Sequence, residues 1–170
     1  MEKLNSEFFF NNLIFTLIIL VACFLQISLN FLSIFVISQP YILAIVFFLT
    51  IKRVNFEASS VLVIIYGLLY DLITGSLIGV HSLFLLLLKF FSIDFNFGDK
   101  VLKKYGEWFL FSLSYIMSLI IVKVIFVIIN LKFPDIYAIS FNIGTTLLLF
   151  PVILFLIDIP KKVFKVLISK

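Results

Sequence analysis

Long apolar runs, interrupted by short polar segments, make up most of this sequence. A helix that crosses the hydrocarbon core of a bilayer, about 30 Å thick, needs roughly 20 predominantly apolar residues. Membrane-spanning strands would instead show segments of about ten residues in which apolar and polar positions alternate, and the runs lack that alternation. The pattern therefore predicts an all-α integral membrane protein with five or six short spans.

The ends of the runs give the boundaries of these helices. Pro40 ends the first run because a proline disfavours helix in the residue before it. Residues 58–88 would be about 46 Å long as one helix, more than a bilayer core, so we expect two helices with a turn near Gly75 and Gly79. Residues 40–51 reach only about 18 Å, and we expect them to cross as a short span. The predicted spans are residues 13–37, 40–51, 58–73, 80–91, 108–129 and 138–157, with a polar loop at 92–107 between the fourth and the fifth.

Basic residues favour six spans over five. The sequence has 13 Lys and Arg against 9 Asp and Glu, a net charge of +4. Because basic residues concentrate in cytoplasmic connections, six spans with both termini in the cytoplasm would place every basic cluster inside. A five-span chain without residues 40–51 would put one cluster on the wrong side. The clusters are Lys52 with Arg53, Lys89 with Lys100, Lys103 and Lys104, and Lys161, Lys162, Lys165 and Lys170.

Composition supports the same class of protein. Apolar residues are 64% of the chain and charged residues 13%, far from the composition of a soluble globular domain. We therefore expect residues 1–170 to form a single transmembrane domain. The first apolar run is longer than the core of a cleaved signal, so we expect it to be retained. Cys23 is the single cysteine, which excludes an intrachain disulfide, and no metal-ligand spacing is present.

One acidic residue lies within the predicted third span. Gly67, Asp71 and Gly75 are spaced four residues apart, so they share one helix face that should pack closely against a neighbouring helix. A carboxylate within a span costs about 2.5–3.5 kcal/mol to insert, so Asp71 should face the bundle and have a partner. A role in packing and a role in transport or binding both remain open, as does a simple capping role at the turn.

Two basic side chains could serve as the partner of Asp71. His81, the sole histidine, opens the fourth span just after the turn, and Lys123 lies in the outer half of the fifth span. Our hypothesis is that Asp71 pairs with Lys123 or with His81 and so fixes the packing of spans three to five. The alternative for Lys123 is that its flexible side chain extends to the outer interface.

Further polar and small residues recur at helical spacing on three other spans, where such side chains typically hydrogen-bond or pack between helices. We expect the residues on the first span to face inward and the pairs on the fifth and sixth spans to mark contacts between packed helices. They are Cys23, Gln26, Asn30 and Ser33 on the first span, Ser114 and Ser118 on the fifth, and Ser140 and Gly144 on the sixth.

The C-terminal segment, residues 158–170, mixes lysines with apolar residues. We expect this cytoplasmic tail to lie on anionic lipids, and we expect no nucleic-acid partner. The sequence has no Gly-rich phosphate loop, no zinc spacing and no Ser/His/Asp set in an aqueous loop. These observations predict a protein that is not an enzyme and that holds no cofactor.

The segment from Tyr66 to Leu83 reads Tyr-Gly-Leu-Leu-x-Asp-Leu-x-x-Gly-x-x-x-Gly-x-His-x-Leu. It resembles the signature of the rod shape-determining protein MreD family. The chain length, the long first span, the Pro before a short second span and the Lys52-Arg53 pair are similar to that family as well, although Leu77 stands where the family usually has a proline. The motif positions are Tyr66, Gly67, Asp71, Gly75, Gly79 and His81.

The resemblance implies a non-enzymatic component of the bacterial cell-elongation complex in the inner membrane. Members of the family are thought to organise lateral peptidoglycan synthesis beside the filament protein MreB, the bitopic protein MreC, and the wall-building transpeptidase and glycosyltransferase. Their fold is similar to the S components of energy-coupling factor transporters. The alternative expectation is therefore a small-molecule-binding subunit of such a transporter, which would keep a polar cavity open to the outside.

Overall fold

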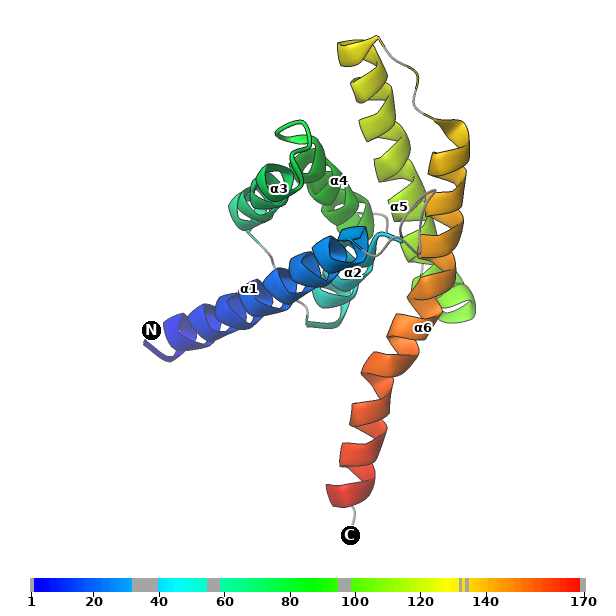
Figure 1. The fold of residues 1–170 in the computed structure, drawn as a ribbon. Helices are drawn as coiled ribbons and strands as arrows, with labels where there is room; N and C mark the ends of the chain where they lie inside the picture. The colour runs from blue at the N-terminus through cyan, green and yellow to red at the C-terminus, as the bar shows by residue number, and fades with distance from the viewer. Residues whose placement is uncertain are drawn as a thin grey trace.

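In the computed structural model, the described residues form six helices and no strand (Figure 1). The structure describes residues 2–31, 40–54, 59–94, 99–131, 133 and 135–168. The predicted all-α class with six helices is confirmed. The helices are α1 (Glu2–Phe31), α2 (Ile42–Val54), α3 (Ser60–Thr74), α4 (Val80–Asp94), α5 (Asp99–Asn130) and α6 (Ile136–Ile168).

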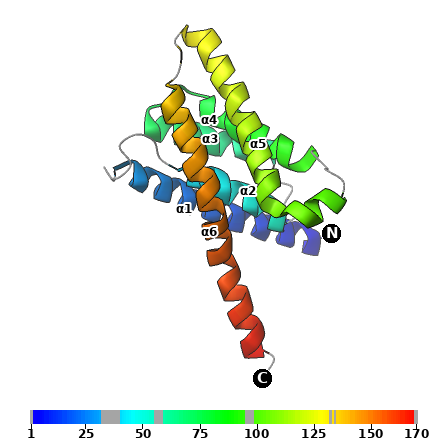
Figure 2. The same cartoon turned by 90° about the vertical axis from the view of Figure 1, so that its right-hand side faces the viewer.

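Helix α2 lies at the centre of the bundle, in contact with α1, α4, α5 and α6 (Figure 2). From Ile42 to Ile51 all of its residues except Thr50 are apolar, which is typical of a helix that neighbours cover on most sides. The side chains from Leu43 to Ile45 and from Phe47 to Ile51 are all buried. This short helix is therefore the core around which the longer helices pack.

Aromatic rings fill the space between α2, α5 and α6. The rings of Phe111 and Phe150 are stacked with centroids 4.5 Å apart, and Phe48 meets Phe111 edge-on at 5.2 Å. Each such pair contributes about 0.5–1.5 kcal/mol beyond the burial of its area. Phe48, Phe111 and Phe150 are fully buried, so this cluster joins the N-terminal helices to the last two.

Helices α1, α4, α5 and α6 extend beyond the predicted short spans. α1 already begins at Glu2, and α6 continues without interruption to Ile168, through most of the predicted tail. The predicted polar loop at 92–107 is wrong for residues 92–94, which belong to α4, and for residues 99–105, which are helical. Gly106, with φ of 70°, breaks α5 there, because glycine adopts that conformation without the strain of a side chain. The predicted spans cover the apolar part of each helix, because they were read from hydropathy. The observed helices also include the polar residues that flank those spans.

Several predicted features lie outside the described residues. They are residues 32–37 of the first span, Ser33, the first residue of the third span and residues 95–98 of the polar loop. The side chains of Asn30, of the basic cluster at 100–104 and of the tail from residue 156 onward lie outside the description as well.

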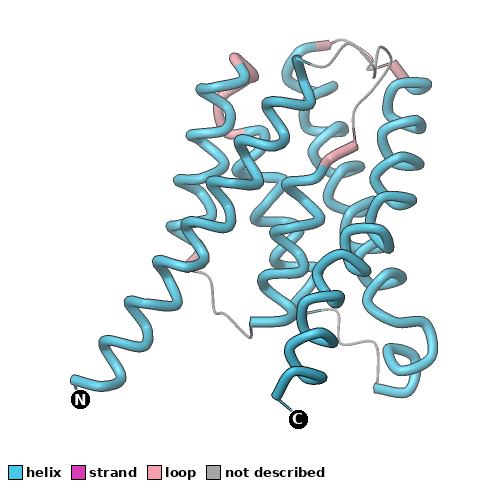
Figure 3. Tube along the Cα trace, turned by 60° about the horizontal axis from the view of Figure 1, so that its bottom comes forward, coloured by secondary structure: helices cyan, strands magenta, loops and turns pink. Residues whose placement is uncertain are grey.

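Two helical segments, Gly106–Ile129 and Ile136–Phe155, are long and apolar enough to cross a membrane. The other apolar helices of the described part are shorter: Phe15–Leu29, Ile42–Lys52, Ser60–Thr74 and Val80–Ile93. Large apolar side chains are exposed along α1, α3, α5 and α6. The two ends of the chain lie at the same end of the bundle, as Figure 3 shows.

Candidate functional site at the turn between α3 and α4

Helices α3 and α4 form an antiparallel hairpin whose closest approach is at Gly67. A Cβ atom added to Gly67 would lie 2.3 Å from the Cα of Ser82, closer than carbon atoms can approach. The Ser82 hydroxyl donates a hydrogen bond of 3.1 Å to the carbonyl of Ile64 at the same level. The predicted packing role of the small residue at position 67 is therefore confirmed: only glycine lets the two backbones approach this closely.

Two glycines shape the turn that follows. Gly75 ends α3 in the left-handed conformation, with φ of 65°, and its N–H donates to the carbonyl of Asp71. Gly79 has φ of 97° just before α4 begins. Both values lie in the region that favours glycine, so the predicted turn is confirmed. The expected packing role of Gly75 is wrong, because nothing lies within 4 Å of the position of its Cβ.

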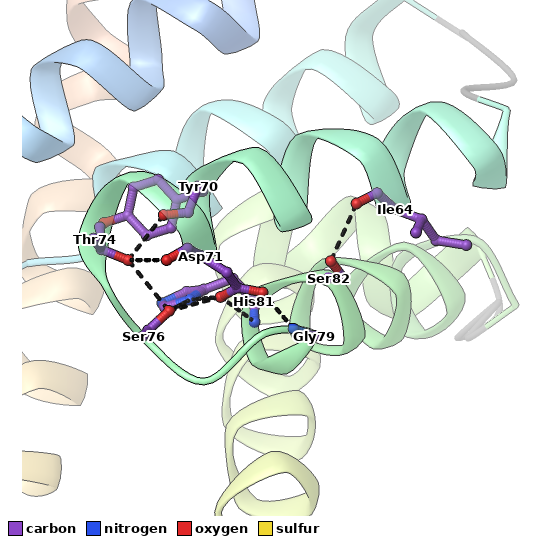
Figure 4. Close-up of polar contacts among 8 residues, drawn as sticks. All are labelled: Ile64, Tyr70, Asp71, Thr74, Ser76, Gly79, His81 and Ser82. Atoms are coloured by element: carbon purple, nitrogen blue, oxygen red, sulfur yellow. Dashed lines mark hydrogen bonds and ion pairs between the residues drawn. The ribbon is translucent and has the colours of Figure 1, made fainter.

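The carboxylate of Asp71 is fully buried beneath this turn and accepts four hydrogen bonds (Figure 4). The backbone N–H of Gly79 donates to one oxygen at 2.7 Å, and the N–H of His81 donates to the other at 3.2 Å. The Ser76 hydroxyl donates at 2.8 Å and the His81 ring at 2.5 Å. The acid at the end of α3 thus caps the N-terminus of α4, where a negative charge is favourable.

His81 is the partner of Asp71. Its Nδ1 lies 2.5 Å from the carboxylate, and because a carboxylate only accepts, Nδ1 carries the proton. The Tyr70 ring packs edge-on against the imidazole at 4.7 Å and the Tyr41 ring at 5.8 Å. The ring is about one quarter exposed. The hypothesis that Asp71 pairs with a basic side chain is confirmed for the histidine.

The structure does not pair Asp71 with Lys123. The Lys123 ammonium lies over the ring of Phe126, 5.9 Å from its centroid, one turn closer to the end of α5. That direction agrees with the alternative in which the lysine extends toward the end of the helix. All four hydrogen bonds to the carboxylate come from the turn and α4, so the acid needs nothing from α5.

The Tyr66 hydroxyl joins the hairpin to the first helix. It donates a hydrogen bond of 2.6 Å to the Thr16 hydroxyl of α1, and its ring meets Phe15 edge-on at 6.2 Å. Tyr66 is buried and lies one residue before Gly67. One side of α3 therefore contacts α4 while an adjacent side contacts α1, so the hairpin is fixed from two directions.

Gln26 is one of the polar residues that we expected to face inward from the first span. It makes two specific hydrogen bonds that its spacing did not predict. Its side-chain nitrogen donates to the Pro40 carbonyl at 3.1 Å, and its oxygen accepts from the Leu43 N–H at 3.4 Å. It thereby satisfies backbone groups at the start of α2. A buried glutamine in an apolar run was the available signal, but the residues that it binds could not be read from the sequence.

Tyr41 and Tyr115, which sequence reasoning did not single out, connect the site to α6. The Thr146 hydroxyl accepts from the Tyr41 N–H at 2.9 Å, and the Tyr115 hydroxyl donates to Asn142 at 2.5 Å. The Tyr41 hydroxyl is buried and has no hydrogen-bond partner among the described residues. Tyr41, just before α2, thus meets the hairpin through ring contacts with Tyr70 and His81 and meets α6 through its N–H.

The structure confirms some of the remaining predictions for small residues and contradicts others. Cys23, Ser114 and Ser118 are buried, as expected. Ser140 and Gly144 are exposed, so the expectation that this pair packs against another helix of the chain is wrong. Within the residues that the structure describes, there is no group of three or more His, Cys, Asp and Glu side chains that could hold a metal ion.

The order of the polar groups limits the chemistry of the site. In a hydrolytic triad the serine faces the imidazole nitrogen opposite the one that the carboxylate binds. Here the Ser76 hydroxyl is 3.2 Å from Nδ1, the same nitrogen that bonds Asp71. These three residues therefore do not form a triad, and their hydrogen bonds serve the turn.

No family model matches the chain. No curated protein and no solved structure matches it either. The similarity to the MreD family therefore stays a prediction from the motif at 66–83 and the arrangement of the apolar runs.

Proposed function

We propose that the chain is a multi-pass protein of the bacterial inner membrane, with six spans and both termini in the cytoplasm. Large exposed apolar side chains along four helices support this placement, because lipid would cover them at no cost. The position of both chain ends at one end of the bundle also supports it (Figure 3). So does Asp71, which is buried and paired as an acid within a span should be.

Within that membrane, we propose that the protein is a non-enzymatic scaffold of the cell-elongation complex, as the MreD-like motif implies. The observation that carries this proposal is the buried Asp71 carboxylate, which accepts four hydrogen bonds from its own hairpin. A buried acid satisfied in this way rigidifies a structure, whereas a ligand-binding acid keeps acceptor sites open. The expected partners are an MreC-type bitopic protein and the wall-building transpeptidase and glycosyltransferase.

An S component of a vitamin transporter would need polar groups that face an outer cavity. The acid and the imidazole nitrogen of the motif are instead engaged with each other and with the turn. This arrangement favours the scaffold over the transporter subunit.

Depletion of the protein in its rod-shaped host, followed by microscopy, tests the role in elongation. We expect the cells to become round, and we expect full-length protein to restore rods. Cells that stay rod-shaped and acquire a vitamin requirement would contradict the proposal. Crosslinking and purification give a second readout: recovery of an MreC-type protein supports the scaffold, and recovery of an ATPase module supports the transporter.

Variants connect the test to the structure. Asp71→Asn should fail to restore rods, because its amide group would place a donor against the donors that the carboxylate now binds. Gly144→Ala is the control, since nothing lies near the position of its Cβ. Membrane levels of both variants must match the wild type for the comparison to count.

A further inference from the structure

A proline interrupts the backbone hydrogen bonding of α6 near its middle. Pro151 lies well inside the helix, which continues to Ile168. In an unbroken helix the N–H of residue 151 would donate to the carbonyl of Leu147, four residues earlier, but proline has no N–H. The Leu147 carbonyl therefore needs another donor, because an unpaired backbone carbonyl is costly away from water.

Trp108 of α5 supplies that donor. Its indole Nε1–H donates a hydrogen bond of 3.0 Å to the Leu147 carbonyl, the one that Pro151 leaves free. A neighbouring helix often makes proline tolerable in a membrane helix in this way. The Trp108 side chain is 46% exposed, so it lies at the edge of the bundle and not in its core. A side chain of one helix thus completes the backbone hydrogen bonding of another.

The packing of α6 against the bundle also changes at this proline. Just before it, the Phe150 ring is fully buried and stacked on Phe111, with centroids 4.5 Å apart. One turn earlier, the Thr146 hydroxyl accepts a hydrogen bond from the Tyr41 N–H. From residue 151 to 155, by contrast, no side chain is buried. Figures 1 and 2 both show the end of α6 extending away from the other helices.

A helix that loses its packing at a proline has the parts of a hinge. Pro151 removes one backbone hydrogen bond and its ring crowds the preceding turn, so this is the point at which α6 bends most easily. The hydrogen bond from Trp108 opposes a further bend, because a change of direction would turn the Leu147 carbonyl away from the indole. The same contact therefore both satisfies the carbonyl and favours one direction of the helix beyond it.

We propose that Pro151 is a hinge in α6 and that the Trp108 indole is its latch. Residues 152–168 then form an arm whose direction the latch sets. The arm includes most of the basic tail, so the latch also determines where the lysines of that tail lie. One neutral hydrogen bond changes an equilibrium by about fivefold, so the latch favours one direction without locking it. The proposal does not depend on the complex to which the protein belongs.

A double-mutant cycle tests whether Trp108 acts through the proline. In the full chain purified in detergent, Trp108→Phe should lower the Tm by about 2–4 °C more in the wild type than in a Pro151→Ala background. The reason is that the alanine N–H donates to the Leu147 carbonyl in place of the indole. Pro160→Ala is the matched control: it changes the same helix without supplying a donor to Leu147, so the full effect of Trp108→Phe should remain.

Distances between two spin labels test whether the arm moves. One label replaces Leu69, which is exposed on α3, and the other replaces Lys162 on the arm, in a chain whose Cys23 has been changed to serine. In lipid nanodiscs, double electron–electron resonance measures this distance. We expect Trp108→Phe to broaden the distribution and to raise the share of other arm positions by about fivefold. Adding Pro151→Ala should narrow it again.

A second pair of labels controls for loosening of the bundle. Leu148 is 75% exposed on α6 and precedes the hinge, so its distance to the label at position 69 should stay the same in every variant. A change confined to the pair with position 162 is the signature of a hinge, whereas a purely structural role of Trp108 would move both pairs or neither.

Each of four outcomes contradicts the proposal. Equal effects of Trp108→Phe on the Tm with and without Pro151 would show that the indole acts through packing and not through the freed carbonyl. An unchanged arm distance in Trp108→Phe would show that nothing is latched. Broadening of both label pairs would show that the whole bundle loosens. Broadening that persists after Pro151→Ala would show that the arm moves for a reason other than the proline.

Discussion

Replacement of Gly67 by alanine tests the packing of the hairpin most sharply. The new methyl group would lie 2.3 Å from the Cα of Ser82, whereas carbon atoms in contact stand about 3.5–4.0 Å apart. The two helices must therefore separate by more than about 1 Å at this level. The Cα of Ser82 is a backbone atom of α4, so no side-chain rotation can relieve the overlap.

The energy follows from three contributions. Overpacking of a close contact costs about 1–3 kcal/mol. Separation would also lengthen the hydrogen bond from Ser82 to Ile64, worth about 1 kcal/mol. Alanine favours a helix over glycine by about 1 kcal/mol, which opposes these losses. We expect a net destabilisation of about 1–3 kcal/mol.

Thermal unfolding of the purified protein in detergent, followed by circular dichroism at a fixed heating rate, measures the effect. At about 2–4 °C for each kcal/mol, the Tm of Gly67→Ala should fall by several degrees. Gly144→Ala is the matched control: it gains the same helix propensity with no contact within 4 Å, so its Tm should stay equal or rise. Equal shifts for the two variants would refute the close approach of α3 and α4.

Three further variants are read in the same assay. Asp71→Asn should destabilise by about 3–5 kcal/mol, because breaking a buried charged pair leaves its partners unsatisfied; a wild-type Tm would contradict the pairing. Gln26→Leu should cost about 1–3 kcal/mol, because it leaves the Leu43 N–H unsatisfied while the Pro40 carbonyl still accepts from the Ile42 N–H, and an unchanged Tm would refute that role. Tyr41→Phe should leave the Tm equal or higher, since it removes a buried hydroxyl without a partner; a clear loss would reveal an unseen partner.

The hairpin was the part of the fold most accessible to sequence reasoning. A run too long for one helix, with glycines inside it, predicted both the reversal and its position, and Gly75 and Gly79 do adopt positive φ. The need of an intramembrane acid for a partner predicted a pair for Asp71. Sequence could not choose between His81 and Lys123, because that choice depends on the conformation of the turn.

Other features could not be predicted for physical reasons. Spacing placed Gly75 on the packing face of Gly67, but α3 ends at Thr74, so helical spacing no longer applies to Gly75. Hydropathy reports which part of a helix is apolar and not where the helix begins, which is why α1 and α5 start earlier than expected. The link from Gln26 to Pro40 joins separate segments that only the packed bundle brings together.

Labelling of the turn between α3 and α4 from outside the cell tests the central claim most directly. A single cysteine replaces Ile78, which is 72% exposed, in a chain whose buried Cys23 has been changed to serine. We predict that a membrane-impermeant maleimide labels this cysteine in intact spheroplasts. Labelling only after the membrane is opened would place the turn in the cytoplasm and contradict the six-span arrangement.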